Sequence, residues 1–152
     1  FEVKDAIDEA LNILRKTIQK EQIEIELNID CKCEVLGILN ELSQVIINLI
    51  QNSKDAFNQN RIKDKKIEIL LTKKIYLGKN YSFLDIIDNA GGVDKHYQDK
   101  IFEPYFTTKH ESQGTGLGLF MSKMIIEKSL DGNLEYCRYK DGSKFTIMIP
   151  MD

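Results

Sequence analysis

The chain has 152 residues, of which 42% are hydrophobic and 30% charged, and its formal net charge is −3. These values are typical of one globular domain, and they give no reason to expect nucleic acid or an anionic membrane as a partner. No apolar run approaches the ~20 residues of a membrane span, no signal peptide is visible, and the odd number of cysteines favours reduced thiols. We therefore expect a single cytoplasmic domain over residues 1–152, and we expect it to be part of a larger protein because it begins at Phe1.

Hydrophobic periodicity predicts the elements of the first 60 residues. Apolar residues at helical spacing predict helices over 3–20 and 38–59. Alternation of apolar and polar residues predicts a half-buried strand over 22–29, and a short strand is expected over 33–36. Cys31 and Cys33 would share one face of that strand, and we expect no metal site there because no matching Cys or His pair follows.

The second part of the chain predicts two hairpins around a long irregular segment. Runs rich in β-forming residues over 66–76 and 80–88 flank Gly78-Lys79-Asn80, and a closing hairpin over 132–138 and 143–150 surrounds Asp141-Gly142. A helix is expected over 115–129. The polar segment over 89–114, of about 25 residues, is long for a loop in a compact domain and favours a functional lid.

The order of these elements predicts an α/β (α+β) fold. Helices and hairpins in this order along the chain favour a two-layer sandwich, with a mixed, mostly antiparallel sheet and about three helices on one of its faces.

Gly114, Gly116 and Gly118 alternate where the last predicted helix begins. Their missing side chains let backbone N–H groups approach a ligand, and the helix N-terminus favours a phosphate. The alternative is a flexible loop that leads into a helix.

Three further groups of residues suit nucleotide chemistry. Asn48 and Asn52 lie four residues apart on one helix, so their amide oxygens face the same way and suit a hard cation; the alternative is a solvated pair. Asp88 ends an apolar strand, where a carboxylate can accept a hydrogen bond from an amine, although an ordinary turn also begins with Asp. Three aromatic residues in the polar segment 101–109 indicate a lid anchor, and Lys109 is placed to reach a phosphate.

In this order the motifs resemble the N box, first glycine box, F box and second glycine box of the GHKL ATPase superfamily, over nearly all of residues 1–150. The chain is most similar to the catalytic ATP-binding domain of sensor histidine kinases, which implies a Bergerat fold with a long ATP lid. The resemblance implies ATP and Mg²⁺ as ligands: Asn52 would hold the metal, Asp88 would bind the adenine amine, and Gly92 would pass close to the base. The positions implied in nucleotide binding are Asn48, Asn52, Asp55, Asp88, Gly92, Val93, Phe102, Thr107, Thr108, Lys109, Gly114, Thr115, Gly116, Leu117, Gly118 and Leu119, with Asn48 and Lys109 also catalytic.

Two positions depart from the family pattern. Ala90 stands where the first glycine of the first glycine box is usual, and its methyl group is tolerated only if its backbone φ is negative. Asp55 stands where many sensor kinases have a lysine, so Lys109 is expected to supply the positive charge.

Asn48 indicates which member of the superfamily this is. Gyrase-like ATPases and related serine kinases place a glutamate there as general base, whereas an amide cannot accept a proton. A histidine acceptor needs less help, because neutral imidazole is already nucleophilic. We therefore expect a histidine kinase whose phosphoacceptor domain and response regulator are separate from this chain, with His96 and His110 as loop residues. The alternatives are a GHKL ATPase or serine kinase, or a degenerate nucleotide-binding interaction module. The chain is expected to be monomeric.

Overall fold

The structure is a computed structural model that describes residues 1–107 and 116–152. Its strands form one layer, and its main helices form a second layer. The helices are α1 (Val3–Ile13), α2 (Arg15–Lys20), α3 (Leu39–Gln59), the short 3₁₀ helix Gln98–Lys100, and α4 (Gly118–Met124), which continues into a π-helical turn (Ile125–Ser129). The strands are β1 (Glu24–Ile29), β2 (Lys66–Tyr76), β3 (Lys79–Asp88), β4 (Asn133–Tyr139) and β5 (Gly142–Pro150).

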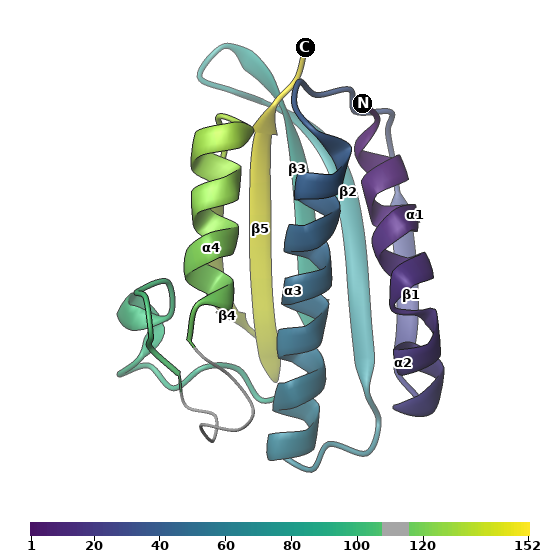
Figure 1. Cartoon of the computed structure of the whole chain (residues 1–152), viewed down its shortest axis with the longest axis vertical. Helices are drawn as coiled ribbons and strands as arrows, with labels where there is room; N and C mark the ends of the chain where they lie inside the picture. Colours follow the sequence, from purple (N-terminus) through teal and green to yellow (C-terminus); the bar gives the residue numbers. More distant parts are fainter. Residues whose placement is uncertain (108–115) are drawn as a thin grey trace.

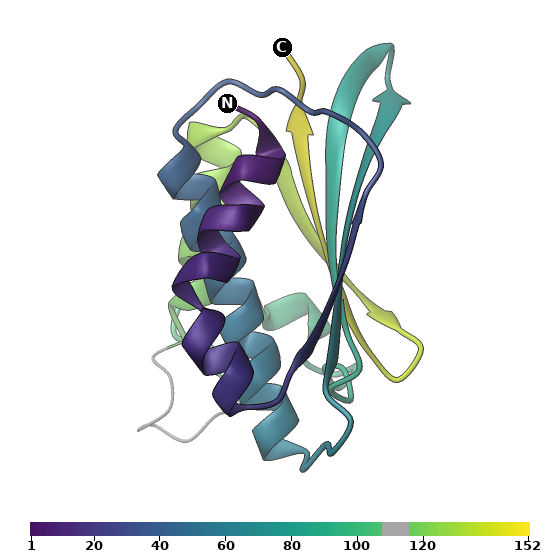
Figure 2. The same cartoon turned by 90° about the vertical axis from the view of Figure 1, so that its right-hand side faces the viewer.

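The five strands form one mixed sheet in the order β1-β2-β3-β5-β4. Strand β1 runs parallel to β2, and the other neighbours are antiparallel. The helices α1, α3 and α4 lie side by side on one face of the sheet (Figures 1 and 2). The predicted fold class, a two-layer sandwich with a mostly antiparallel sheet, is therefore confirmed.

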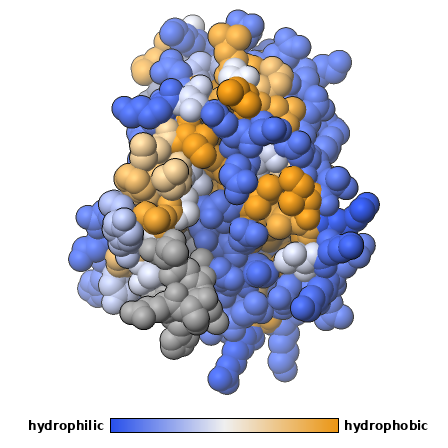
Figure 3. Space-filling model, in the orientation of Figure 1, coloured by the Kyte–Doolittle hydropathy of each residue, from blue (hydrophilic) through white to orange (hydrophobic). Residues whose placement is uncertain are grey.

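The core lies between α3 and the central strands. The apolar face of α3 is buried because its hydrophobic residues recur at helical spacing, and Phe57 and Leu49 are both 0% exposed. Alternate residues of β2, including Ile67 and Ile69, point into the same core. The outer face of the helix layer is largely hydrophilic with separate apolar patches (Figure 3), and the exposed side chain of Met121 lies on α4.

Three details differ from the sequence prediction. Residues 33–36 form no strand: they make only isolated bridges, Glu2 with Glu34 and Val35 with Met151, because each neighbouring segment pairs with a single residue there. The helix predicted over 3–20 is divided at Leu14, whose ψ of 1° leaves the helical range. The last helix begins at Gly118 rather than at residue 115, which lies outside the described residues.

The hairpin turns also lie one residue earlier than predicted. Tyr76 pairs with Lys79, so the β2–β3 turn consists of Leu77 and Gly78, both with positive φ, as a type I′ hairpin requires. Tyr139 pairs with Gly142, so the β4–β5 turn consists of residues 140 and 141. Within the described ranges, no helix is long and apolar enough to cross a membrane.

Candidate functional site

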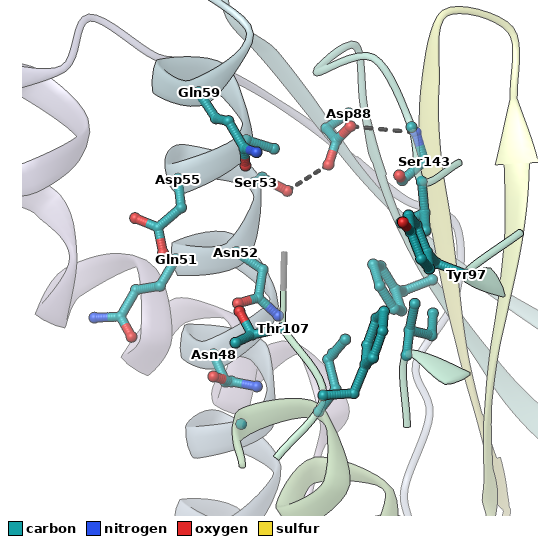
Figure 4. A pocket seen from close by; sticks show the side chains of 18 of the residues that line it. Asn48, Gln51, Asn52, Ser53, Asp55, Gln59, Asp88, Tyr97, Thr107 and Ser143 are labelled. Atoms are coloured by element: carbon teal, nitrogen blue, oxygen red, sulfur yellow. Dashed lines mark hydrogen bonds between the residues drawn. The ribbon is translucent and has the colours of Figure 1, made fainter. Parts of the chain in front are cut away.

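A cavity of about 540 Å³ lies between α3, the end of β3, the segment that follows it, the start of α4 and the start of β5. Its size is within the range of small-molecule sites. The residues that line it are Asn48, Gln51, Asn52, Ser53, Asp55, Ala56, Gln59, Asn60, Asp88, Gly92, Val93, Asp94, Tyr97, Ile101, Phe106, Thr107, Gly116, Gly118, Leu119, Ser143 and Phe145. One side of the cavity is therefore polar and helical, and the other is partly aromatic (Figure 4).

The polar side of the cavity is one face of α3. Asn48, Asn52, Asp55 and Gln59 recur at helical spacing, so they line the cavity while the opposite face of α3 is buried in the core. Figure 4 shows Asn48 and Asn52 on successive turns beside Thr107. The prediction that the two asparagines share one face is confirmed.

Asp88 lies beside α3 at the end of β3, at the other end of the cavity from Asn48 (Figure 4), and is only 8% exposed. Its Oδ2 accepts a hydrogen bond from the Ser53 hydroxyl (2.6 Å), and its Oδ1 accepts from the backbone N–H groups of Ala90 (3.0 Å) and Ser143 (3.2 Å). Burial raises the pKa of Asp88 above its ordinary value, and these three donors oppose that increase. The carboxylate is thus fixed in position and can accept a further donor from the cavity.

Asn48 joins α3 to the start of α4. Its Nδ2 donates to the Ser122 hydroxyl at 3.0 Å. A Cβ on Gly118 would lie 2.5 Å from Asn48 Oδ1, so a larger residue there would displace the Asn48 amide from its place against α4. Asn48 therefore positions the N-terminus of α4 at the edge of the cavity, a role that helical spacing alone does not indicate.

The first glycine segment contains two residues that require glycine. Gly91 and Gly92 have φ of +100° and +73°, and a Cβ on Gly92 would lie 2.9 Å from the carbonyl oxygen of Gly142. Ala90 is outside the left-handed region and is 1% exposed, so its methyl group packs into the core. The departure from the family pattern at this position is compatible with the local backbone.

The segment after β3 is held to the sheet at its start. The Val93 N–H donates to the hydroxyl of Tyr136 at 2.8 Å, and the same hydroxyl lies 3.1 Å from Ser143 Oγ. Phe102 packs edge-on against Phe145, with ring centroids 6.3 Å apart. Phe102 thus anchors the segment, as predicted, but it does not line the cavity.

Gly116 is packed against the aromatic segment. Its φ is +76°, its carbonyl oxygen accepts from the Tyr105 N–H at 2.9 Å, and a Cβ there would lie 2.4 Å from the Tyr105 carbonyl carbon. An alanine at this position would strain the backbone whether or not a ligand is bound.

The predicted site residues divide into three groups. Those that line the cavity are Asn48, Asn52, Asp55, Asp88, Gly92, Val93, Thr107, Gly116, Gly118 and Leu119. Phe102 and Leu117 do not line it, and the ring of Phe102 packs against Phe145 instead. Thr108, Lys109, Gly114 and Thr115 lie outside the described residues, as does His110. His96 is exposed, and its backbone N–H donates to Asp94 Oδ1.

Sequence reasoning missed Ser53, Asn60, Ser122, Tyr136 and Ser143. Each acts through a hydrogen bond between distant segments: Asn60 Nδ2, for example, donates to the Ala90 carbonyl oxygen at 2.6 Å. Of these five residues, only Ser53 could have been indicated by the sequence, because it directly follows Asn52 on a helix that was already expected to contribute to the site.

Residues 37–152 match the family model described as "Histidine kinase-, DNA gyrase B-, and HSP90-like ATPase". The two-component sensor PprA of Pseudomonas aeruginosa is 31% identical over 99% of this chain and 16% of its own length. Sporulation kinase B of Bacillus subtilis is 27% identical over 100% of this chain and 33% of its own length. The chain therefore spans at most about a third of these relatives.

Solved structures of a histidine kinase are similar in fold to this chain. The catalytic domain of the histidine kinase ThkA superposes with a TM-score of 0.83 at 28% identity, over 99% of this chain and 93% of that one. A complex of ThkA with the response regulator TrrA contains a chain with the same fold, with a TM-score of 0.76 at 24% identity, over 100% of this chain and 41% of that one.

Proposed function

Because the chain belongs to the family of histidine kinase-, DNA gyrase B- and HSP90-like ATPases, we propose that it binds Mg²⁺-ATP and donates the γ-phosphoryl group to a histidine on another domain of its parent protein. A cytoplasmic location, where ATP is available, belongs to the same proposal. Sensor kinases among its relatives, such as PprA, support this choice within the family.

The observation that carries the proposal is the polarity of the cavity. A buried carboxylate, Asp88, lies on one side, and the amides of Asn48 and Asn52 lie on the other. The carboxylate accepts hydrogen bonds and suits the exocyclic amine of adenine, whereas amide oxygens and a helix N-terminus suit Mg²⁺ and phosphates. Phosphoryl transfer needs mainly such positioning and charge neutralisation, so one nucleotide would span the cavity in a defined direction.

The residues present fit a Mg²⁺ ion held together with phosphates. Mg²⁺ usually takes one or two protein oxygen ligands and keeps water or phosphate oxygens as the others. Asn52 is assigned here as the protein ligand, and Asp55, one turn later, offers carboxylate oxygens at the same side of the cavity. When bound, the ion neutralises charge on the phosphate groups.

A histidine acceptor is favoured over water or serine by Asn48. This residue lies one turn before Asn52, and its Nδ2 is engaged with Ser122. An amide cannot take a proton from water or from a hydroxyl, but a neutral imidazole nucleophile needs no base. Both histidines of the chain, His96 and His110, fall in the segment expected to form the ATP lid, so the acceptor is assigned to another domain.

The roles of Thr108, Lys109, Gly114 and Thr115 remain part of this proposal, as ligands of the triphosphate. A response regulator is the proposed recipient of the phosphoryl group in the next step, by analogy with the complex of ThkA and TrrA. The isolated chain is proposed to be monomeric, and light scattering at micromolar concentration tests this: a dimer would contradict it.

The test is a transfer assay with the parent's separately purified phosphoacceptor domain and ATP labelled at the γ-phosphate. We expect an acid-labile label on that domain, with Mg²⁺ required, because phosphohistidine hydrolyses in acid. An acid-stable label would indicate a serine kinase, and phosphate release without acceptor would indicate an ATPase. Absence of nucleotide binding would indicate a degenerate interaction module. Each of these three outcomes would contradict the proposal.

A further inference from the structure

Ser53 is a buried side chain whose hydroxyl group contacts the Asp88 carboxylate at the end of β3. It lies on α3 and is 3% exposed, and its Oγ is 2.6 Å from Asp88 Oδ2. The two other donors to Asp88 are backbone N–H groups, and both contact Oδ1. Among the described residues, Ser53 therefore provides the side-chain donor to Oδ2, beside the cavity (Figure 4).

The Ser53 hydroxyl has a second acceptor within reach. Its Oγ is 3.3 Å from the carbonyl oxygen of Leu49, one turn earlier on α3. A hydroxyl has one proton, so it donates fully either to Asp88 or to Leu49. The first arrangement requires Asp88 to accept, while the second leaves a Ser53 lone pair facing Asp88 Oδ2 and favours a protonated carboxyl group. The shorter distance selects the first arrangement.

We propose that Ser53 is a positioning residue that keeps Asp88 as a hydrogen-bond acceptor, and that it thereby makes the site select 6-amino over 6-oxo purine nucleotides. The inference rests on the proposed function, because it assumes that the base lies beside Asp88. A purine amine donates a hydrogen bond to an ionised carboxylate, whereas a 6-oxo group is itself an acceptor and is repelled by it. A protonated Asp88 would instead donate to the 6-oxo group, so discrimination depends on the state that Ser53 favours.

The charged groups around Asp88 make its ionisation state depend on the hydrogen bond from Ser53. Asp141, on the β4–β5 turn, acts with burial to raise the pKa of Asp88, and Asp55 of α3 and Asp94 line the same cavity. On the other side, the guanidinium of Arg138 on β4 lies next to Gly92. Ser53 is the first of the groups that lower the pKa of Asp88, ahead of the two backbone donors, so its removal shifts Asp88 toward the protonated form.

The experiment compares Mg²⁺-ATP and Mg²⁺-ITP binding to the wild-type chain and to Ser53→Ala by calorimetric titration from pH 5 to pH 9. The control is Ser43→Ala, since Ser43 is also buried on α3 (2% exposed) and its Oγ has no hydrogen-bond partner within the described part of the chain. A ratio of two affinities on one variant cancels any loss of folded protein. We expect Ser53→Ala to reduce the ATP-to-ITP affinity ratio about tenfold or more, the value of one hydrogen bond to a charged group.

The pH profile separates this role from a merely structural one. We expect ATP affinity to fall as pH is lowered through the pKa of Asp88, and this fall to begin at higher pH in Ser53→Ala than in the wild type or in Ser43→Ala. Ser53→Thr, which keeps the hydroxyl, should restore the ATP-to-ITP ratio.

Two results have different meanings. If the wild-type chain binds ATP but Ser53→Ala changes neither the affinity ratio nor the pH profile, the role of Ser53 is refuted while the proposed function stands. If the wild-type chain binds no Mg²⁺-ATP at any pH, the proposed function itself fails, and the inference fails with it.

Discussion

Replacement of Asp88 by asparagine is expected to weaken ATP binding while it stabilises the fold at neutral pH. The two effects have opposite signs because the ionised carboxylate is useful to a ligand and costly to bury. Burial raises the pKa of Asp88, so the folded chain binds a proton there more tightly than the unfolded chain does. The contribution of Asp88 to stability is therefore favourable at low pH and is lost as pH rises through its raised pKa.

The geometry allows the new amide side chain in Asp88→Asn to satisfy every hydrogen bond. Its oxygen can accept from the N–H groups of Ala90 and Ser143, and its amide nitrogen can donate to Ser53 Oγ. The Ser53 proton can then turn to the Leu49 carbonyl oxygen, 3.3 Å away. None of these buried polar atoms loses its hydrogen-bond partner. The free energy of unfolding therefore increases, because the variant buries no charge at this position. The ligand loses one charge-assisted acceptor, worth about 1.5–3 kcal/mol, or roughly 10- to 150-fold in Kd.

Two measurements check this prediction. Calorimetric titration with Mg²⁺-ATP gives the loss of affinity. Urea unfolding followed by far-UV circular dichroism gives the stability, since the chain has no Trp for fluorescence. Asp88→Asn should be more stable than the wild type at pH 8, and the difference should shrink as pH falls toward 4. A variant that is less stable at pH 8, or a difference independent of pH, would refute the reasoning.

Three other changes have defined outcomes. Asn52→Ala should remove the Mg²⁺-dependent part of ATP affinity, so that titrations with Mg²⁺ and with EDTA coincide; a remaining Mg²⁺ effect would assign the ion to other residues. Gly118→Ala places a Cβ 2.5 Å from Asn48 Oδ1, and we expect a loss of about 1–3 kcal/mol in urea unfolding from the overpacked α3–α4 contact; unchanged stability would mean that the contact adjusts freely. Burial raises the pKa of Cys33 to about 12, so at pH 8 only about one thiol in ten thousand is ionised. A thiol reagent should therefore modify exposed Cys137 first and Cys33 only on unfolding, and rapid labelling of Cys33 in the folded chain would contradict its burial.

Much of the fold could be predicted because the periodic elements are long. The helix expected over 38–59 is observed as Leu39–Gln59, and both hairpins are present. In these elements, local propensity and burial favour the same structure. The strand expected over 33–36 was wrong because a strand needs neighbours, and here the two chain ends each supply only one bridging residue.

The candidate site, like the fold, could be predicted only in part from the sequence. Helical spacing alone predicted that Asn48 and Asn52 face one way, and the apolar run before Asp88 predicted that it ends a strand. The contact between Ser53 and Asp88 joins residues 35 positions apart, and the bond between Asn48 and Ser122 joins residues 74 apart. No local pattern contains such pairs, because they depend on how α3 packs against β3 and α4. The sequence by itself therefore determined which residue types carry the chemistry, and the tertiary structure decided which partners hold Asp88 and Asn48 in place.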